Sequence, residues 1–165
     1  NNFSQDELVG PRVVSPWNEH LFKVNEKSKK LDQAKAELFH TVVAQGLFAC
    51  KRGRPDISPA IAHLKTRVRN PSQDDWSKLV RLMIFLKQTC KDVPTLCADG
   101  SQSLKWHADA AFAVHPELKS HSGASMTRGD GAIMPISHKQ GMNTRSSTEA
   151  KVVAADEIVD PMLWT

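Results

Sequence analysis

Apolar residues recur at helical spacing between residues 31 and 90, in three segments separated by breaks. In the first segment, 31–50, the apolar positions are Leu38, Val42, Val43, Leu47 and Phe48. These positions fall on one face of a helix with 3.6 residues per turn, so the segment is predicted to be an amphipathic helix. Gly46 lies within it and would allow a neighbouring element to pack closely.

Proline and capping residues predict where the next two helices begin. After a break that ends at Pro55, Asp56 is expected to be the N-cap of a second helix. Asn70-Pro71 ends that helix, and Ser72 with Asp75 forms an acidic variant of the capping box in front of a third helix, 73–89. The apolar stripe of the second helix is Ile57, Ile61, Leu64 and Val68, and that of the third is Trp76, Leu79, Val80, Met83, Ile84 and Leu86.

The helical spacing gives way to short segments after residue 90. Residues 104–112, 124–127 and 132–137 are predicted strands, and the Arg128-Gly129-Asp130-Gly131 turn predicts a hairpin between the last two. A final helix is expected to begin at the Ser146–Glu149 capping box, continue through four apolar residues, Val152, Val153, Ile158 and Val159, and end or kink at Pro161. The predicted fold class is therefore α+β.

Composition is typical of a globular protein rather than a disordered one. The chain has 165 residues, 40% of them hydrophobic and 24% charged, which is enough for one ordinary domain or pieces of two. The three cysteines are odd in number and lack C-x-x-C spacing, so neither a disulfide framework nor a zinc site is expected. No signal peptide and no apolar run of about 20 residues is visible. The expected location is intracellular, either cytoplasmic or nuclear, without a membrane partner. Because it begins with Asn1, the chain is expected to be a fragment or a processed product.

Four short motifs in the helical region occur in an order that resembles a known family. They are Arg54-Pro55-Asp56-Ile57, Asn70-Pro71, Trp76 and Leu86-Lys87-Gln88-Thr89. This succession is similar to the segment that follows the polymerase core in copia-type retrotransposon reverse transcriptases. Residues 31–90 are therefore interpreted as the helical connection segment of such a polyprotein, and the polar residues 1–30 as an extended arm or linker.

The last third of the chain resembles the start of the ribonuclease H domain in the same family. The family pattern has a strand ending in S-D-A-D-W-A, then S-x-S-G, then S-S-T-E-A-E opening a helix that runs to L-W. The corresponding runs here are residues 108–113, 120–123, 146–151 and 163–164. The resemblance implies that residues 91–165 form an incomplete ribonuclease H-like half-domain of about three strands and one helix.

The resemblance also implies which carboxylates would perform catalysis. Ribonuclease H-type enzymes hold two Mg²⁺ ions about 4 Å apart, and Mg²⁺ prefers oxygen ligands. Asp109 matches the first carboxylate and is the candidate catalytic and metal-binding residue. Lys151 occupies the second position, where an ammonium cannot coordinate Mg²⁺, and the third family carboxylate would lie on a strand beyond Thr165.

The polymerase motif of the family, an aromatic residue followed by x-D-D, is not found in this sequence. There is no tyrosine, and the adjacent pair Asp74-Asp75 lacks the aromatic residue and fits an acidic helix start. The chain is therefore predicted to be a catalytically incomplete part of a Pol polyprotein that combines RNA-directed DNA polymerase and ribonuclease H. Three histidines near Asp109, at positions 107, 115 and 121, fit no common ligand spacing and are expected to be solvated loop residues.

Positive charge is concentrated between residues 51 and 81, which hold eight basic and three acidic residues in a chain of net charge +4. In the family this region lies near the template–primer duplex, so Arg54, Lys65, Arg67 and Arg69 are candidate phosphate contacts. A solvated surface without a ligand is the plain alternative. The implied partners are an RNA–DNA hybrid or template–primer duplex and the rest of the Pol polyprotein. A non-catalytic nucleic-acid-binding module and a structural or interaction protein remain open as other functions.

Overall fold

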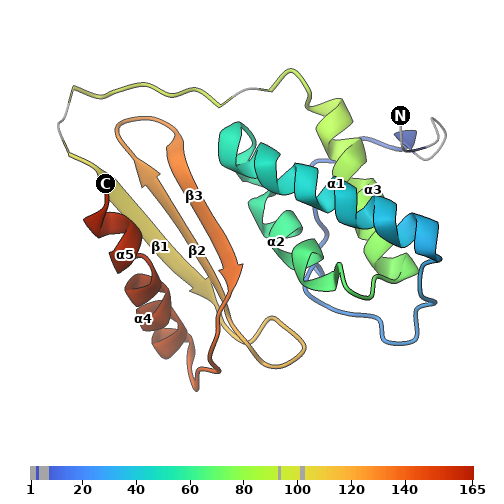
Figure 1. Cartoon of the computed structure of the whole chain (residues 1–165). Coiled ribbons are helices and arrows are strands. Elements are labelled where there is room, and N and C mark those ends of the chain that lie inside the picture. The colour runs from blue at the N-terminus through green and yellow to red at the C-terminus, as the bar shows by residue number, and fades with distance from the viewer. Residues whose placement is uncertain (1–2, 4–7, 93, 101–102) are drawn as a thin grey trace. The chain divides into compact units, whose positions relative to one another are not determined.

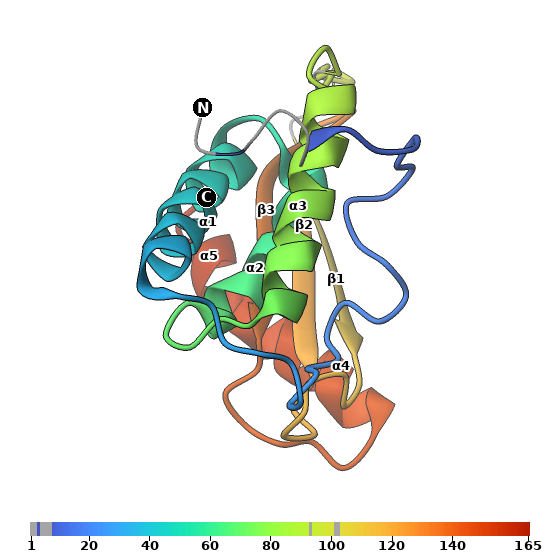
Figure 2. The same cartoon turned by 90° about the vertical axis from the view of Figure 1, so that its right-hand side faces the viewer.

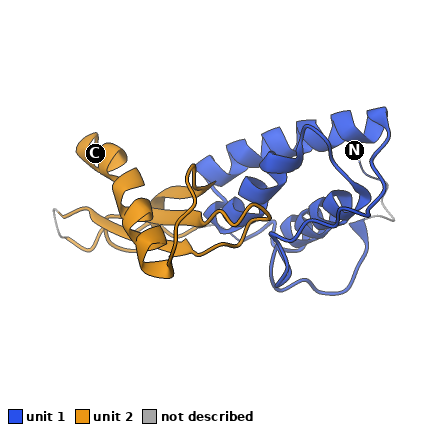
Figure 3. Cartoon of the chain, turned by 90° about the horizontal axis from the view of Figure 1, so that it is seen from below, with its two compact units in different colours: residues 1–93 blue, residues 94–165 orange. Residues whose placement is uncertain are grey.

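The computed structural model describes residues 3, 8–92, 94–100 and 103–165, and it divides the chain into two compact units, 1–93 and 94–165 (Figure 3). The first unit contains helices and the second contains an antiparallel sheet with a helix packed on it, so the predicted α+β class is confirmed. The elements in order are α1(Gln33–Arg52), the 3₁₀ turn η2(Pro55–Ile57), α2(Ser58–Arg67), α3(Gln73–Gln88), β1(Lys105–Ala111), β2(His121–Thr127), β3(Ala132–Lys139), α4(Ser147–Glu157) and α5(Val159–Leu163).

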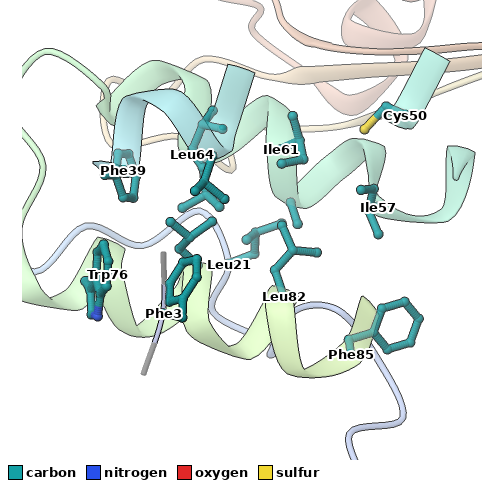
Figure 4. Close-up of a cluster of buried hydrophobic side chains, with 14 of the residues drawn as sticks. Phe3, Leu21, Phe39, Cys50, Ile57, Ile61, Leu64, Trp76, Leu82 and Phe85 are labelled. Carbon is teal, nitrogen blue, oxygen red and sulfur yellow. The ribbon is translucent and has the colours of Figure 1, made fainter. Parts of the chain in front are cut away.

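The three long helices of the first unit share one apolar core (Figure 4). Its buried side chains come from every element of the unit and include Phe39, Val43, Ile57, Ile61, Leu64, Leu79 and Leu82. The predicted close approach at Gly46 is present, because a Cβ atom built there would lie 2.3 Å from Ile61 Cδ1. A side chain at position 46 would therefore require the Ile61 side chain of α2 to shift.

The buried face of α3 differs from the predicted stripe. Leu82 and Phe85 are buried together with Trp76, whereas Met83 and Ile84 are only partly buried against the core. From Trp76 to Phe85 every third residue is buried. Because a helical turn has 3.6 residues, the buried face shifts gradually around the helix axis along α3. The sequence pattern, which allowed steps of both three and four, did not distinguish the centre of this stripe from its flank.

The helix starts confirm two predicted caps, Ser72 and Ser146, and contradict a third, Asp56. The Ser72–Asp75 capping box is formed in both directions at the start of α3. Asp56 is not the N-cap of α2, because the 3₁₀ turn that begins at Pro55 leads directly into the helix and makes Ile57 the N-cap. The Asp56 carboxylate instead accepts hydrogen bonds from Arg54.

The described part of the arm contains neither an α-helix nor a strand, yet it packs onto the helices. Val13 and Leu21 are buried in the shared core, and the Phe3 ring stacks on Trp76 with 5.3 Å between ring centroids. The Gln88 side chain of α3 accepts from Val13 N–H at 2.8 Å, which ties the arm alongside the helix (Figure 2). The polar composition of the arm did not predict this packing. Residues 1, 2 and 4–7 of the predicted arm lie outside the described residues.

In the second unit, β2 lies between β1 and β3 and pairs antiparallel with both (Figure 1). The predicted hairpin is formed, and its turn requires Gly129, which has φ 93° and would place a Cβ atom 2.1 Å from Cys97 O. Helix α4 packs on β1 and β2 through Ala150 and Ala154, whose small side chains are buried. Three strands and one helix of this kind are compatible with the partial ribonuclease H-like domain expected from the sequence.

The last helix is interrupted at Ile158, three residues before Pro161. Helix α4 ends at Glu157, and α5 restarts at Val159. Pro161 has no N–H to donate to the carbonyl of Glu157, so a continuous helix would leave that carbonyl unpaired. Within the described residues, no helix is both long enough and apolar enough to cross a membrane.

Candidate functional site

The predicted catalytic carboxylate, Asp109, lies on the edge strand β1 with its side chain 76% exposed. Its partner in the β1–β2 register is Gly123, which belongs to the Ser-His-Ser-Gly run. Directly opposite residues in an antiparallel pair project to the same face of the sheet. Since Gly123 has no side chain, the face next to Asp109 stays open. The two runs that resemble the family thus combine to expose this carboxylate.

Lys151 lies next to Asp109 in space. Its Nζ is 3.2 Å from Asp109 Oδ1, and the lysine side chain is 58% exposed. The pKa of Asp109 is lowered, first by the hydrogen bond that its carboxylate accepts from Ala110 N–H at 2.9 Å and then by Lys151. Because both groups are largely in water, this ion pair contributes little to stability. Its importance is positional, since the structure brings the first and second carboxylate positions of the predicted site together.

The side chains present do not fit a pair of Mg²⁺ ions. The Asp109 carboxylate already faces an ammonium, and a cation beside it would be repelled by Lys151. Glu149 is not a replacement ligand, because its carboxylate accepts from Arg145 N–H at 2.6 Å while its own N–H donates to Ser146 Oγ. Over the described ranges, no group of three or more His, Cys, Asp or Glu side chains is placed to hold a metal ion.

The candidate phosphate contact Arg54 is held in a network inside the first unit. Its Nη2 lies 2.7 Å from Asp56 Oδ2 and 2.7 Å from Thr89 Oγ1, and its Nη1 donates to the Thr89 carbonyl oxygen at 3.1 Å. The hydrogen bond with Asp56 raises the pKa of Arg54. The Arg-Pro-Asp-Ile and Leu-Lys-Gln-Thr motifs are thus joined by one guanidinium, which fastens the end of α3 to the turn before α2.

Arg67 is also engaged within the chain. Its Nε lies 3.2 Å from Asp75 Oδ1, and the Asp75 side chain is 1% exposed. The same carboxylate accepts hydrogen bonds from the Ser72 N–H and hydroxyl at 2.8 and 2.9 Å. Arg67 therefore neutralises a buried charge between α2 and the start of α3.

Lys65 and Arg69 are exposed, unlike Arg54 and Arg67. Lys65 belongs to α2, and Arg69 follows the end of that helix. Of the four basic residues that the sequence nominates, these two present their side chains most fully to solvent. Phosphate binding by any of the four stays a prediction.

A buried histidine pair in the second unit was missed by the sequence analysis. His115 Nε2 lies 3.1 Å from His121 Nδ1, and His121 Nε2 lies 2.8 Å from Ser137 Oγ. Both rings are buried, so the expectation of solvated loop histidines is wrong for them, while His107 is exposed as expected. Burial lowers the pKa of His115 to about 4. The predicted strand, 124–127, began too late to include His121, which is the first residue of β2 and whose strand pairing brings Ser137 within reach.

A second polar network lies where α4 meets the sheet. The buried Gln140 side chain donates to Ser122 Oγ and to the Ala150 carbonyl oxygen, both at 2.9 Å. Glu157 accepts from Ser122 Oγ at 2.5 Å and lies 2.9 Å from His138 Nε2. These contacts fix α4 on the sheet and thereby set the position of Lys151.

Comparison with known proteins identifies relatives of one kind. The chain is 31% identical over 160 residues to the retrovirus-related Pol polyprotein from transposon TNT 1-94 of Nicotiana tabacum, a match that covers 92% of this chain and 12% of the relative. It is 30% identical over 124 residues to a transposon Ty5-1 protein of Saccharomyces cerevisiae, covering 73% of this chain and 40% of the relative. The chain therefore spans a minor part of either protein. No family model and no solved structure matches the chain.

Proposed function

Because this chain is a homologue of copia-type retrotransposon Pol polyproteins, we propose that it corresponds to the region where reverse transcriptase passes into ribonuclease H, with a ribonuclease H site that is defective. The order of elements supports this assignment. A helical unit carrying the Arg-Pro-Asp-Ile and Leu-Lys-Gln-Thr motifs precedes three antiparallel strands and a helix. The parent activity is the copying of RNA into DNA with cleavage of the RNA strand of the hybrid.

The contact between Lys151 and Asp109 carries the proposal of a defective site. Two-metal cleavage of a phosphodiester requires several carboxylates that converge on the same small volume. Here the group that reaches the Asp109 carboxylate, at 3.2 Å, is an ammonium. It neutralises the carboxylate that would attract Mg²⁺, so the chain keeps the position of the site without its metal chemistry.

A cleavage assay tests this proposal. The full chain, in excess over an RNA–DNA hybrid labelled on the RNA strand, is incubated with Mg²⁺ or Mn²⁺ beside an Asp109→Asn variant. We expect the two proteins to give the same background of cut RNA. Metal-dependent cleavage by the wild-type chain that the Asp109→Asn variant lacks would refute the proposal.

Nucleic-acid binding without catalysis is the second candidate function, and it is favoured by the exposure of Lys65 and Arg69. Each phosphate contact that is lost lowers the slope of log K against log salt by about 0.9 for duplex DNA. A Lys65→Gln/Arg69→Gln double variant should therefore bind a duplex more weakly and lower the slope by about 2. Arg67 is unsuitable for this test because its removal would leave Asp75 buried without its cation. Equal binding by the wild type and the double variant, or no binding at moderate salt, would favour a structural or interaction role.

A further inference from the structure

The first unit contains a pocket of about 430 Å³ between the arm and helices α2 and α3. Residues 16–25 of the arm form one side of it, and α2 and α3 form the other. This volume falls within the roughly 300–1,000 Å³ of small-molecule sites in proteins. The pocket exists because the arm crosses the helices without filling the space beneath it.

The inner wall of the pocket is apolar. Leu21 of the arm and Leu64 of α2 are both buried where they line it, and Trp17 adds a half-buried aromatic side chain. An aromatic side chain beside aliphatic ones suits a flat, unsaturated ring, because such a ring can be covered on its faces.

The rim of the pocket is cationic. Lys23, Lys78 and Arg81 line it against one carboxylate, that of Asp74. Lys78 is already engaged, since its Nζ lies 3.0 Å from Asp74 Oδ2 and donates to the Lys23 carbonyl oxygen. Lys23 and Arg81 are thus the cations left to balance the charge of a ligand.

Arg81 supplies a donor in need of an acceptor. Its Nε is buried and has no hydrogen-bond partner among the described residues. A buried donor without an acceptor costs about 1–3 kcal/mol, and hydrogen bonds from a guanidinium to an anionic oxygen are among the strong ones in proteins. Arg81 also lines the pocket, so its guanidinium is a cation that an anionic ligand there would meet.

We propose that this pocket binds a nucleotide, with the base against Trp17 and the phosphate between Arg81 and Lys23. The apolar wall and the cationic rim match the two halves of a nucleotide better than they match an acidic peptide, which would place no flat ring beside the aliphatic wall. The same chemistry is offered by a free nucleotide and by one residue of a single strand. This inference does not depend on the ribonuclease H assignment or on phosphate binding by Lys65 and Arg69.

The test is a titration of the ¹⁵N-labelled full chain followed by amide chemical shifts. Three probes are used in parallel: deoxyadenosine monophosphate, inorganic phosphate and an oligothymidylate of eight residues. We expect saturable shifts at residues 16–25 and 74–81 with the nucleotide or the oligonucleotide, and weaker binding of inorganic phosphate. Saturation by the free nucleotide assigns the site to nucleotides in solution, and saturation only by the oligonucleotide assigns it to a strand.

Matched variants identify the groups responsible. Arg81→Gln should weaken nucleotide binding about tenfold or more, because it removes a charged donor. Lys23→Gln, at an exposed position that does not threaten folding, should weaken it severalfold. Lys91→Gln changes an exposed cation outside the pocket and should leave the affinity for the free nucleotide unchanged. The proposal is overturned if neither the free nucleotide nor the oligonucleotide gives a saturable shift at concentrations up to about 10 mM. A dissociation constant above this concentration would mean that the pocket has no useful affinity for a nucleotide. It is also overturned if Lys23→Gln and Lys91→Gln have equal effects, or if an acidic peptide, titrated in the same way as a fourth probe, binds as well as the nucleotide.

Discussion

Burial of His115 makes the second unit sensitive to acid. The pKa of His115 is about 4, below the ordinary value of 6.5, because the buried ring is desolvated. Between these values the unfolded chain takes up a proton that the folded chain does not, so unfolding becomes easier as the pH falls. The contribution to stability is complete above pH 6.5 and is lost progressively down to about pH 4. A tenfold difference in proton affinity corresponds to about 1.4 kcal/mol, so the full loss is about 3 kcal/mol.

Methionine methyl resonances allow the two units to be followed in one sample. Met126 is buried in the second unit, and Met83 lies on α3 in the first. Urea unfolding at several pH values between 7 and 4.5 would be recorded for the wild type and for His115→Gln, whose amide keeps a polar contact with His121 but does not titrate. The free energy of unfolding reported by Met126 should fall by about 2 kcal/mol more in the wild type than in the variant between pH 7 and pH 5.

Met83 serves as the internal control, because the first unit does not contain His115. Other groups of the second unit also titrate, including Glu117, whose pKa is lowered by its hydrogen bond from Lys139. The comparison with His115→Gln cancels their effects. Equal pH dependence in the two proteins at Met126 would refute the argument that the buried His115 ring opposes protonation.

Three substitutions in the first unit have expected costs that urea unfolding can measure. Gly46→Ala should destabilise the unit by about 1 kcal/mol. Overpacking against Ile61 costs about 1–3 kcal/mol, and the higher helix propensity of alanine offsets about 1 kcal/mol of this. Adding Ile61→Val should restore the lost stability, because it removes the methyl group that clashes. Arg54→Lys should cost about 1–2 kcal/mol, because an ammonium cannot reproduce the paired bonds of the guanidinium. Arg67→Gln should cost about 2–3 kcal/mol. This is below the 3–5 kcal/mol typical of a broken buried ion pair, because the Ser72 N–H and hydroxyl still donate to the Asp75 carboxylate. No change in any one case would contradict the role given to that residue.

Local signals in the sequence predicted the elements well where one residue decides the outcome. Ser72 and Asp75 form their capping box because the two partners are only three positions apart and no distant group is required. Gly46 marks a close helix contact, because a side chain there would meet Ile61 of the neighbouring helix. Asp56 shows the limit of such signals. Its carboxylate could accept hydrogen bonds either from the backbone N–H groups at the helix start or from Arg54. In the structure it accepts them from Arg54, which also donates to Thr89.

Features that depend on distant contacts were not predictable from local patterns. The burial of His115 and His121 depends on strand pairing that brings Ser137 to the same place. The burial of Val13 in the arm depends on contacts with α3, including one from Gln88. In each case a polar or unpatterned stretch becomes ordered through partners more than a dozen residues away. The candidate site was predicted through the family resemblance, because composition alone gives no reason to single out Asp109.

We propose that Lys151 excludes a metal ion from Asp109, and paramagnetic line broadening by Mn²⁺ is a direct test. The amide of Ala110, which donates to the Asp109 carboxylate, is the reporter. Wild type, Lys151→Ala and Lys151→Glu would be titrated under the same conditions. We expect little selective broadening in the wild type, more in Lys151→Ala and most in Lys151→Glu, which restores the second carboxylate. Selective broadening of the Ala110 amide that is as strong in the wild type as in Lys151→Glu would contradict it.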